Sequence, residues 1–100
     1  MSVTTTKADI VNNISKTTGI SKVETKAVVE GVIASLIEAV TAGNKVELRG
    51  FGVFYSKRRK PRQARNPKTG ATVELGERFV PLFKPSTDFT QKVNENLTKK

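Results

Sequence analysis

The chain of 100 residues contains no cysteine, no histidine and no tryptophan. Without cysteine it cannot form disulfides or thiolate metal sites, and a reducing compartment is permitted. Without histidine, the usual zinc sites, Ser-His-Asp catalysis and pH switching near neutrality lose their main side chain. We therefore expect no metal site and no cofactor.

Carboxylates and long apolar runs are also scarce. The nine Asp and Glu residues are scattered singly, and Glu74 and Glu77 form the only close pair. Because general acid–base catalysis needs positioned proton donors and acceptors, we expect no catalytic residues and no enzyme. No apolar run approaches the roughly 20 residues that a membrane span requires, and the first residues do not resemble a signal peptide. We expect a cytoplasmic protein without a membrane or small-molecule partner.

Positive charge, in contrast, is abundant and concentrated. The chain carries 18 Lys and Arg against nine Asp and Glu, which predicts a polyanionic partner. Residues 57–68 carry seven basic and no acidic side chains, whereas residues 1–56 carry six and five, and residues 69–100 carry five and four. Such a localised excess is typical of a nucleic-acid-binding surface.

Two capping boxes, Thr6 with Asp9 and Ser21 with Glu24, each precede a helical pattern. They predict helices over residues 7–17 and about 21–42, with glycines at the ends of both. The run "AVVEGVIASLIEAV" within the second helix is apolar over more than one stripe. A short helix cannot cover it, so we expect a two-fold symmetric dimer. The alternative is a compact monomer in which this helix is central.

Short β-prone segments follow, at residues 45–48, 51–56, 71–75 and 78–83. Residues 57–65 contain no large apolar side chain, so a strand there would project into solvent or lie on a ligand. "NPKTG" at 66–70 is a turn sequence, in which Asn66 makes a side-chain turn, Pro67 pre-sets φ and Gly70 accepts a positive φ. Ser86 is expected to cap a last helix that ends at about Asn96.

The basic run therefore lies on a predicted β-hairpin, with cations on both faces and at the tip. Arginine pairs with phosphates in a bidentate manner and enters a narrow minor groove more readily than lysine. Major-groove readout is not supported, because no helix carries a set of base-reading side chains. Three alternatives stay open: a disordered charge run, Pro67 as a turn former only, and an RNA-binding or ribosome-associated protein.

Three ordered motifs carry a family resemblance: "GFGVF" at 50–54, "RNPKTG" at 65–70 and "VPLFKP" at 80–85. After two helices, they resemble the HU/integration host factor family of bacterial histone-like DNA-bending proteins over about residues 6–97. The "VELRGFG" and "FVPLFKP" stretches look closer to the integration host factor subunits. Two positions depart from the family pattern, Ala64 where many members have glycine and Thr87 where HU often has lysine.

The resemblance implies an α+β fold, in which an intertwined dimer has a helical body, a three-stranded antiparallel sheet saddle and protruding β-hairpin arms. It implies one domain over 1–100, with a frayed N-terminus at 1–5, a helical dimerisation part at 6–43, a sheet at 44–85 and a C-terminal helix at 86–97. The DNA-binding arm would span about 57–78. We expect a homodimer, and a heterodimer with a paralogue stays open.

The implied function is that of an architectural, nucleoid-associated protein that bends and compacts double-stranded DNA from the minor groove with little sequence specificity. Kinking of DNA by apolar wedges is described for this family itself, and Pro67 matches the wedge. The resemblance and the charge pattern together predict DNA contacts by Lys57, Arg58, Arg59, Lys60, Arg62, Arg65, Asn66, Pro67, Lys68, Arg49, Lys84 and Lys7. The dimer interface is expected to include Phe51, Phe54, Phe83, Val32, Leu36 and Val40.

Overall fold

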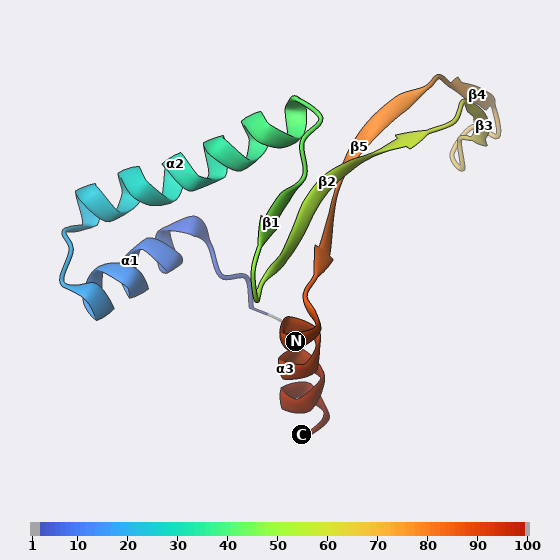
Figure 1. Cartoon of the computed structure of the whole chain (residues 1–100). Helices are drawn as coiled ribbons and strands as arrows, with labels where there is room; N and C mark the ends of the chain where they lie inside the picture. Colours follow the sequence, from blue (N-terminus) through green and yellow to red (C-terminus); the bar gives the residue numbers. More distant parts are fainter. Residues whose placement is uncertain (1–2, 100) are drawn as a thin grey trace. The chain divides into compact units, whose positions relative to one another are not determined.

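The computed structural model describes residues 3–99, which form three α-helices and five β-strands (Figure 1). The chain divides into two compact units, one up to Glu38 and one from Ala39. Of the N-terminus predicted to be frayed, Met1 and Ser2 lie outside the described residues. The elements in order are α1 (Lys7–Thr18), α2 (Lys22–Thr41), β1 (Val46–Leu48), β2 (Gly52–Arg59), β3 (Arg62–Arg65), β4 (Thr72–Leu75), β5 (Arg78–Pro85) and α3 (Thr87–Thr98).

The first capping box begins α1 as predicted. The backbone N–H of Asp9 donates to Thr6 Oγ1 at 3.2 Å, and the N–H of Thr6 donates to Asp9 Oδ2 at 3.0 Å. Two backbone donors that the helix leaves free are thereby satisfied. The helix ends at Gly19, where φ is 79° and the N–H bonds to the Ser15 carbonyl at 2.9 Å.

Helix α2 has a similar start and a glycine end. Glu24 N–H donates to Ser21 Oγ at 3.2 Å, while the Ser21 hydroxyl donates to the Glu24 carboxylate at 3.3 Å. At the other end Gly43 adopts a φ of 89° and donates to the Val40 carbonyl at 2.9 Å. Both predicted helices are confirmed to within one residue at each end.

Strands β1, β2 and β5 form a three-stranded antiparallel sheet with β2 in the centre. The predicted strands 51–56 and 78–83 extend further, to Arg59 and Pro85. Eight residue pairs join β2 to β5. Backbone hydrogen bonds between the strands therefore extend the sheet through residues 57–59, although these basic side chains favour solvent. Pro81 lies on the edge strand β5, where its missing N–H is tolerated, as predicted.

Alternation along β2 and β5 gives the sheet two chemically different faces. The aromatic face carries residues 54, 56 and 58 of β2 opposite residues 83, 81 and 79 of β5. The basic face carries residues 53, 55, 57 and 59 of β2 opposite residues 84, 82, 80 and 78. This division decides which side of the sheet each cation occupies.

An aromatic cluster packs at the end of the sheet where α3 begins. The ring centroid of Phe83 lies 4.6 Å from that of Phe54 and 5.1 Å from that of Phe51. Phe89 of α3 stacks on Phe51 at 5.4 Å. Ser86 caps α3 as predicted, because its Oγ accepts the Phe89 N–H at 3.1 Å.

The described part of a single chain buries very few side chains. Among residues 3–99, Val11 of α1, 6 % exposed, and Thr25 of α2, 3 % exposed, are buried, and so is Gly52 at the start of β2. Apolar side chains of α2 remain open to solvent, with exposed fractions of 65 % at Val28, 52 % at Val32 and 61 % at Ile37. One chain therefore leaves uncovered much of the apolar surface that a stable domain normally buries.

Candidate nucleic-acid interface

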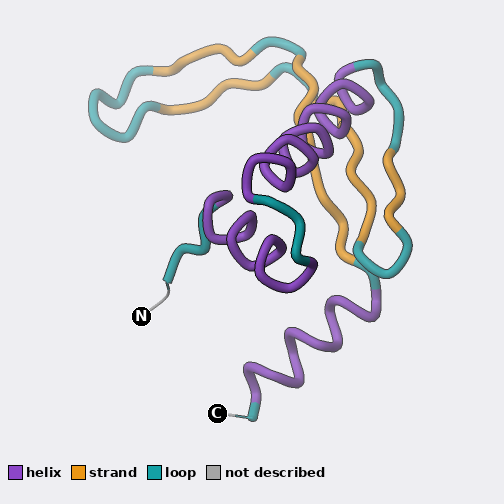
Figure 2. The backbone as a smooth tube through the Cα atoms, turned by 90° about the vertical axis from the view of Figure 1, so that its left-hand side faces the viewer, coloured by secondary structure: helices purple, strands orange, loops and turns teal. Residues whose placement is uncertain are grey.

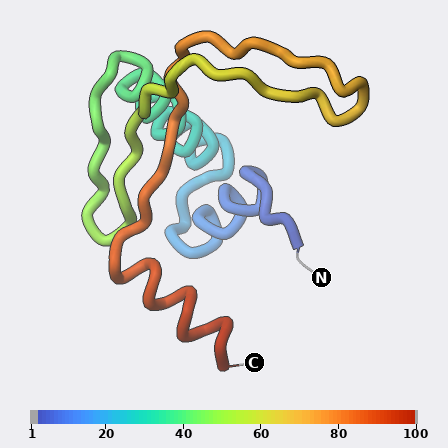
Figure 3. Tube along the Cα trace, turned by 90° about the vertical axis from the view of Figure 1, so that its right-hand side faces the viewer, coloured from blue at the N-terminus to red at the C-terminus, as the bar shows by residue number. Residues whose placement is uncertain are grey.

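A two-stranded arm extends beyond the three-stranded sheet. Strands β3 and β4 pair antiparallel from Arg62 opposite Leu75 to Arg65 opposite Thr72. Figures 2 and 3 show this ribbon leaving the sheet and turning away from the direction of its strands. The predicted projecting hairpin is therefore present in the described part of the chain.

The tip of the arm is a tight turn held by the residues predicted to form it. Asn66 Oδ1 accepts the Lys68 N–H at 2.9 Å, which is a side-chain turn. Asn66 also closes the loop through its backbone, receiving the Gly70 N–H at 2.8 Å and donating to the Ala71 carbonyl at 2.8 Å. Gly70 has a φ of 72°. Pro67 follows Asn66 directly and lies exposed at the far end of the hairpin.

Cations occupy both faces of the arm, as predicted. Arg62 and Arg65 belong to opposite faces of β3, because they are three residues apart on a strand. Lys68 is in the tip turn, and Lys60 lies between β2 and β3. No acidic residue occurs between Lys57 and Lys68, and the one acid within β3 and β4 is Glu74, opposite Gln63. The charge of the arm is therefore mainly positive.

The basic face of the sheet continues this surface towards the body. Lys57 and Arg59 of β2 and Lys84 of β5 all belong to it. Arg78, directly opposite Arg59, adds a fourth cation that was not among the predicted DNA contacts. Three of the predicted DNA contacts therefore share one face.

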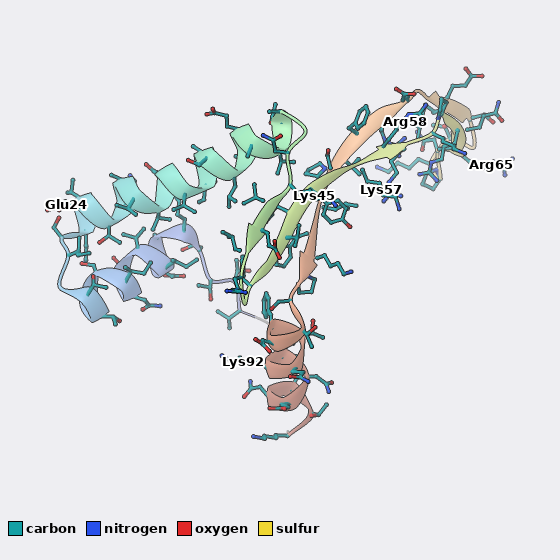
Figure 4. All side chains as sticks on the ribbon, in the orientation of Figure 1. Glu24, Lys45, Lys57, Arg58, Arg65 and Lys92 are labelled. Carbon is teal, nitrogen blue, oxygen red and sulfur yellow. The ribbon has the colours of Figure 1, made fainter. Side chains whose placement is uncertain are left out.

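Arg58 lies on the aromatic face and is engaged within the chain. Its Nε donates to Glu77 Oε2 at 2.8 Å, and its Nη2 contacts the same oxygen. Both side chains are about half exposed, at 55 % and 47 %. Figure 4 shows Arg58 beside Lys57 on the segment of β2 that leads to the arm. Among the predicted cations of the run 57–68, Arg58 is thus the one whose charge is already compensated in the described structure.

The remaining two predicted DNA contacts, Lys7 and Arg49, lie in different parts of the chain. Lys7 of α1 forms an ion pair with Glu30 of α2 at 2.8 Å, within the helical unit. The hydrogen bond from Lys7, together with its charge, lowers the pKa of the Glu30 carboxyl below its usual value of 4.5. Arg49 lies in the turn between β1 and β2, where Gly50 has a φ of 82°.

The residues predicted to form the dimer interface fall into two groups. Phe51, Phe54 and Phe83 belong to the aromatic cluster, in which Phe51 is still 43 % exposed and Phe83 37 %. Val32 is exposed, while Leu36 and Val40 are half-buried. Phe89 of α3, which was not among the predicted interface residues, also belongs to the cluster.

Comparison with known proteins assigns the chain to a family. Residues 5–94 match the family model described as bacterial DNA-binding protein. The chain belongs to this family. It is 38 % identical to integration host factor subunit beta of Marinobacter nauticus, over 94 % of this chain and 97 % of that protein. It is 37 % identical to the DNA-binding protein HU of Thermus thermophilus, over 92 % and 95 % respectively.

Solved structures agree with this assignment. A cocrystal structure of Anabaena HU with DNA matches with a TM-score of 0.83 at 37 % identity, over 89 % of this chain and 97 % of that chain. An HU mutant from Thermotoga maritima, at 22 % identity and a TM-score of 0.67, supports the fold. The HU/integration host factor resemblance and the α+β fold are confirmed.

Family membership also decides the class of function. As an HU/integration host factor protein, the chain is an architectural DNA-binding protein and not an enzyme. Nothing in the comparisons favours the RNA-binding alternative. In residues 3–99, no helix is both long and apolar enough to cross a bilayer.

Two features of the site depend on strand register and do not follow from the sequence pattern alone. The sequence predicts a strand over residues 51–56 that ends before the basic run, which leaves Lys57, Arg58 and Arg59 equivalent. Extending the two-residue alternation from Phe54 through Arg59 separates Arg58 from its neighbours. Arg78 could be placed opposite Arg59 only with the pairing partner known.

Proposed function

We propose that two copies of this chain bind double-stranded DNA together, with two arms following the minor groove and the basic faces of the sheets contacting backbone phosphates. The observation that carries the proposal is the arm itself. It is a hairpin whose first strand continues a run, residues 57–68, that contains seven cations and no acidic residue, and its far end carries Pro67. Anabaena HU, the matched structure at a TM-score of 0.83, is bound to DNA.

Within this proposal the cations differ in role. Arg59, Lys57 and Lys84 lie on the basic face, where they would hold phosphates next to the body. Arg62 and Arg65 lie on opposite faces of the arm, so one strand could contact both walls of a groove. Arg58 contributes less, because Glu77 already compensates it. Asn66, Lys60, Lys68, Arg49 and Lys7 complete the proposed set of contacts.

Pro67 is proposed as the wedge that enters between base pairs. Its ring is apolar, rigid and without an N–H donor, and Pro67 lies in the turn that joins β3 to β4. The turn hydrogen bonds of Asn66 hold the backbone next to it. An inserted apolar side chain unstacks a base step and kinks the duplex, as described for this family.

A second copy of the chain is the proposed cover for the exposed apolar side chains of α2 and for the aromatic cluster. Val32, Leu36 and Val40 would contact the partner copy, together with Phe51, Phe54 and Phe83. The proposed dimer is a homodimer, acting in the nucleoid of the cytoplasm. The relatives named as subunits of integration host factor keep a heterodimer with a paralogue as the second possibility.

A competition experiment tests the choice of partner. A labelled duplex that is nicked or pre-bent is incubated with the protein and challenged with unlabelled straight duplex or structured RNA of equal charge. We expect the pre-bent duplex to compete best, since its deformation is already made, and RNA to compete worst. Stronger competition by the RNA would contradict the proposal.

A further inference from the structure

We propose that Arg78 and Arg59 together form a phosphate-binding site at the root of the arm, on the basic face of the sheet. The proposal deepens the function proposed above, on which it rests, and it assigns a role to a residue that neither the charge run nor the family motifs selected. The ligand is a phosphodiester group of the DNA backbone.

The register places the two arginines side by side. Arg59 and Arg78 are directly opposite partners in the β2–β5 ladder. The Cβ atoms of such partners lie about 4.5–5.5 Å apart, and like charges in this position destabilise a sheet. The sheet therefore holds two guanidinium groups within reach of one anion, at a cost in stability of the free protein.

The nearby carboxylates do not relieve this repulsion. Glu77 is adjacent to Arg78, but its carboxylate is bound by Arg58, which lies on the aromatic face. Glu74 lies in β4, opposite Gln63. Glu47 of β1 belongs to the basic face, but it pairs with Val53 at the other end of β2.

One donor of Arg78 is unsatisfied. Its Nη1 atom is buried and has no hydrogen-bond partner among the described residues. Both Arg59 and Arg78 are only partly exposed. A buried donor without an acceptor destabilises the free protein. A rotation of the Arg78 guanidinium towards an incoming oxygen would give this donor its acceptor. A phosphate can accept from both guanidinium groups at once, as arginine forks do with this ligand.

The location suits a DNA backbone rather than a free ion. Arg59 and Arg78 are the last pair of the three-stranded sheet, and the next residues on both strands are unpaired before β3 and β4 begin. Lys57 and Lys84 lie further along the same face. A DNA strand following this row towards the arm would place successive phosphates along it, whereas a free phosphate would bind one site only.

The test is the salt dependence of duplex affinity for Arg78→Gln, Arg59→Gln, the double variant and the control Lys92→Gln. Lys92 lies in α3 and gives the same loss of one charge. Each arginine variant should weaken binding and reduce the magnitude of the slope of log K against log salt by up to about 0.9, the value for the complete loss of one phosphate contact. The double variant should lose less than the two single losses combined, since the phosphate is shared.

The substitution Arg78→Gln is expected to weaken DNA binding but not to lower the stability of the free protein. Measuring both quantities separates a binding role of Arg78 from a structural one. Arg78→Gln removes a like-charge contact, so its thermal midpoint without DNA should stay the same or rise. A lower midpoint together with an unchanged salt slope would show that Arg78 is structural and would overturn the proposal. So would a slope for Arg78→Gln equal to that of Lys92→Gln.

Two further outcomes are distinguishable. If the unsubstituted protein shows no steep salt dependence with duplex DNA, the proposed function itself fails. If inorganic phosphate, added at constant ionic strength, displaces DNA from the unsubstituted protein but not from Arg78→Gln, the site selects a free ion and the assignment to the DNA backbone is wrong. We expect equal, weak effects of inorganic phosphate on both proteins.

Discussion

At the scale of single residues, Pro67 combines a place in the tip turn with the proposed role of a wedge between base pairs. The Asn66 side-chain turn and the positive φ of Gly70 already account for a stable tip. These interactions explain why the chain turns there, but they do not require an apolar ring next to Asn66. The wedge role therefore rests on family membership and on the place of Pro67 at the end of the arm.

Pro67→Ala separates the two roles. Affinity for a straight duplex should be largely kept, because the cations supply it. The bend should decrease, because unstacking costs a few kcal/mol per step and alanine cannot offset that. Fluorescence transfer between dyes at the two ends of a duplex measures the bend. Pro61→Ala, at the root of the same arm, is the control, and an equal effect of both substitutions or no effect of Pro67→Ala would contradict the wedge role.

At the scale of elements, the antiparallel ladder between β2 and β5 sets the geometry of the basic face. At Gly52 the backbones of β2 and β5 leave no room for a side chain. An added Cβ would lie 2.5 Å from the Lys84 carbonyl oxygen and 2.6 Å from the Phe83 ring. The backbone oxygen cannot move without shifting β5. Gly52 thereby links the packing of the aromatic cluster to the position of Lys84 on the other face.

Gly52→Ala should therefore destabilise the free protein by about 1–3 kcal/mol, as overpacking usually does. Urea unfolding followed by circular dichroism measures the change. Gly76→Ala is the matched control, since an added Cβ there meets nothing within 4 Å. A stability loss at Gly52 no larger than that at Gly76 would show that β5 adjusts freely.

The elements also show what could be predicted from the sequence. Caps, glycine ends and the Asn66 turn are local interactions within a few residues, so the helices and the tip were predicted closely. Residues 57–59 were not assigned to a strand, because their side chains lack β-type apolar alternation and the ladder to β5 is a long-range effect. The Arg58–Glu77 pair and the Arg59–Arg78 juxtaposition follow from that register and could not be predicted without it.

At the scale of the whole molecule, the chain exposes apolar surface that another copy would cover. Val28, Val32 and Ile37 are more than half exposed on α2, and the aromatic cluster is partly open. Obligate dimers bury surfaces of this kind, which resemble a domain core divided between two chains. Folding and dimerisation are therefore expected to be coupled.

Light scattering of the pure chain should give a mass near twice 10.9 kDa. Val32→Asp should shift the protein towards monomer or unfolded chain, because a charge would be buried at the interface. Val23→Asp is the control, since Val23 is 82 % exposed at the start of the same helix and outside the proposed contact set. A monomeric mass for a folded, DNA-binding protein would contradict the proposal that two copies bind DNA with two arms.

The central claim is that arms and basic faces hold the DNA backbone mainly through charge. Its most direct test is the slope of log K against log salt for a straight duplex. With about five to seven phosphates neutralised, the slope should be roughly −4.5 to −6. A slope near −1 would contradict the claim, because it would leave the acid-free run of seven cations without phosphate partners.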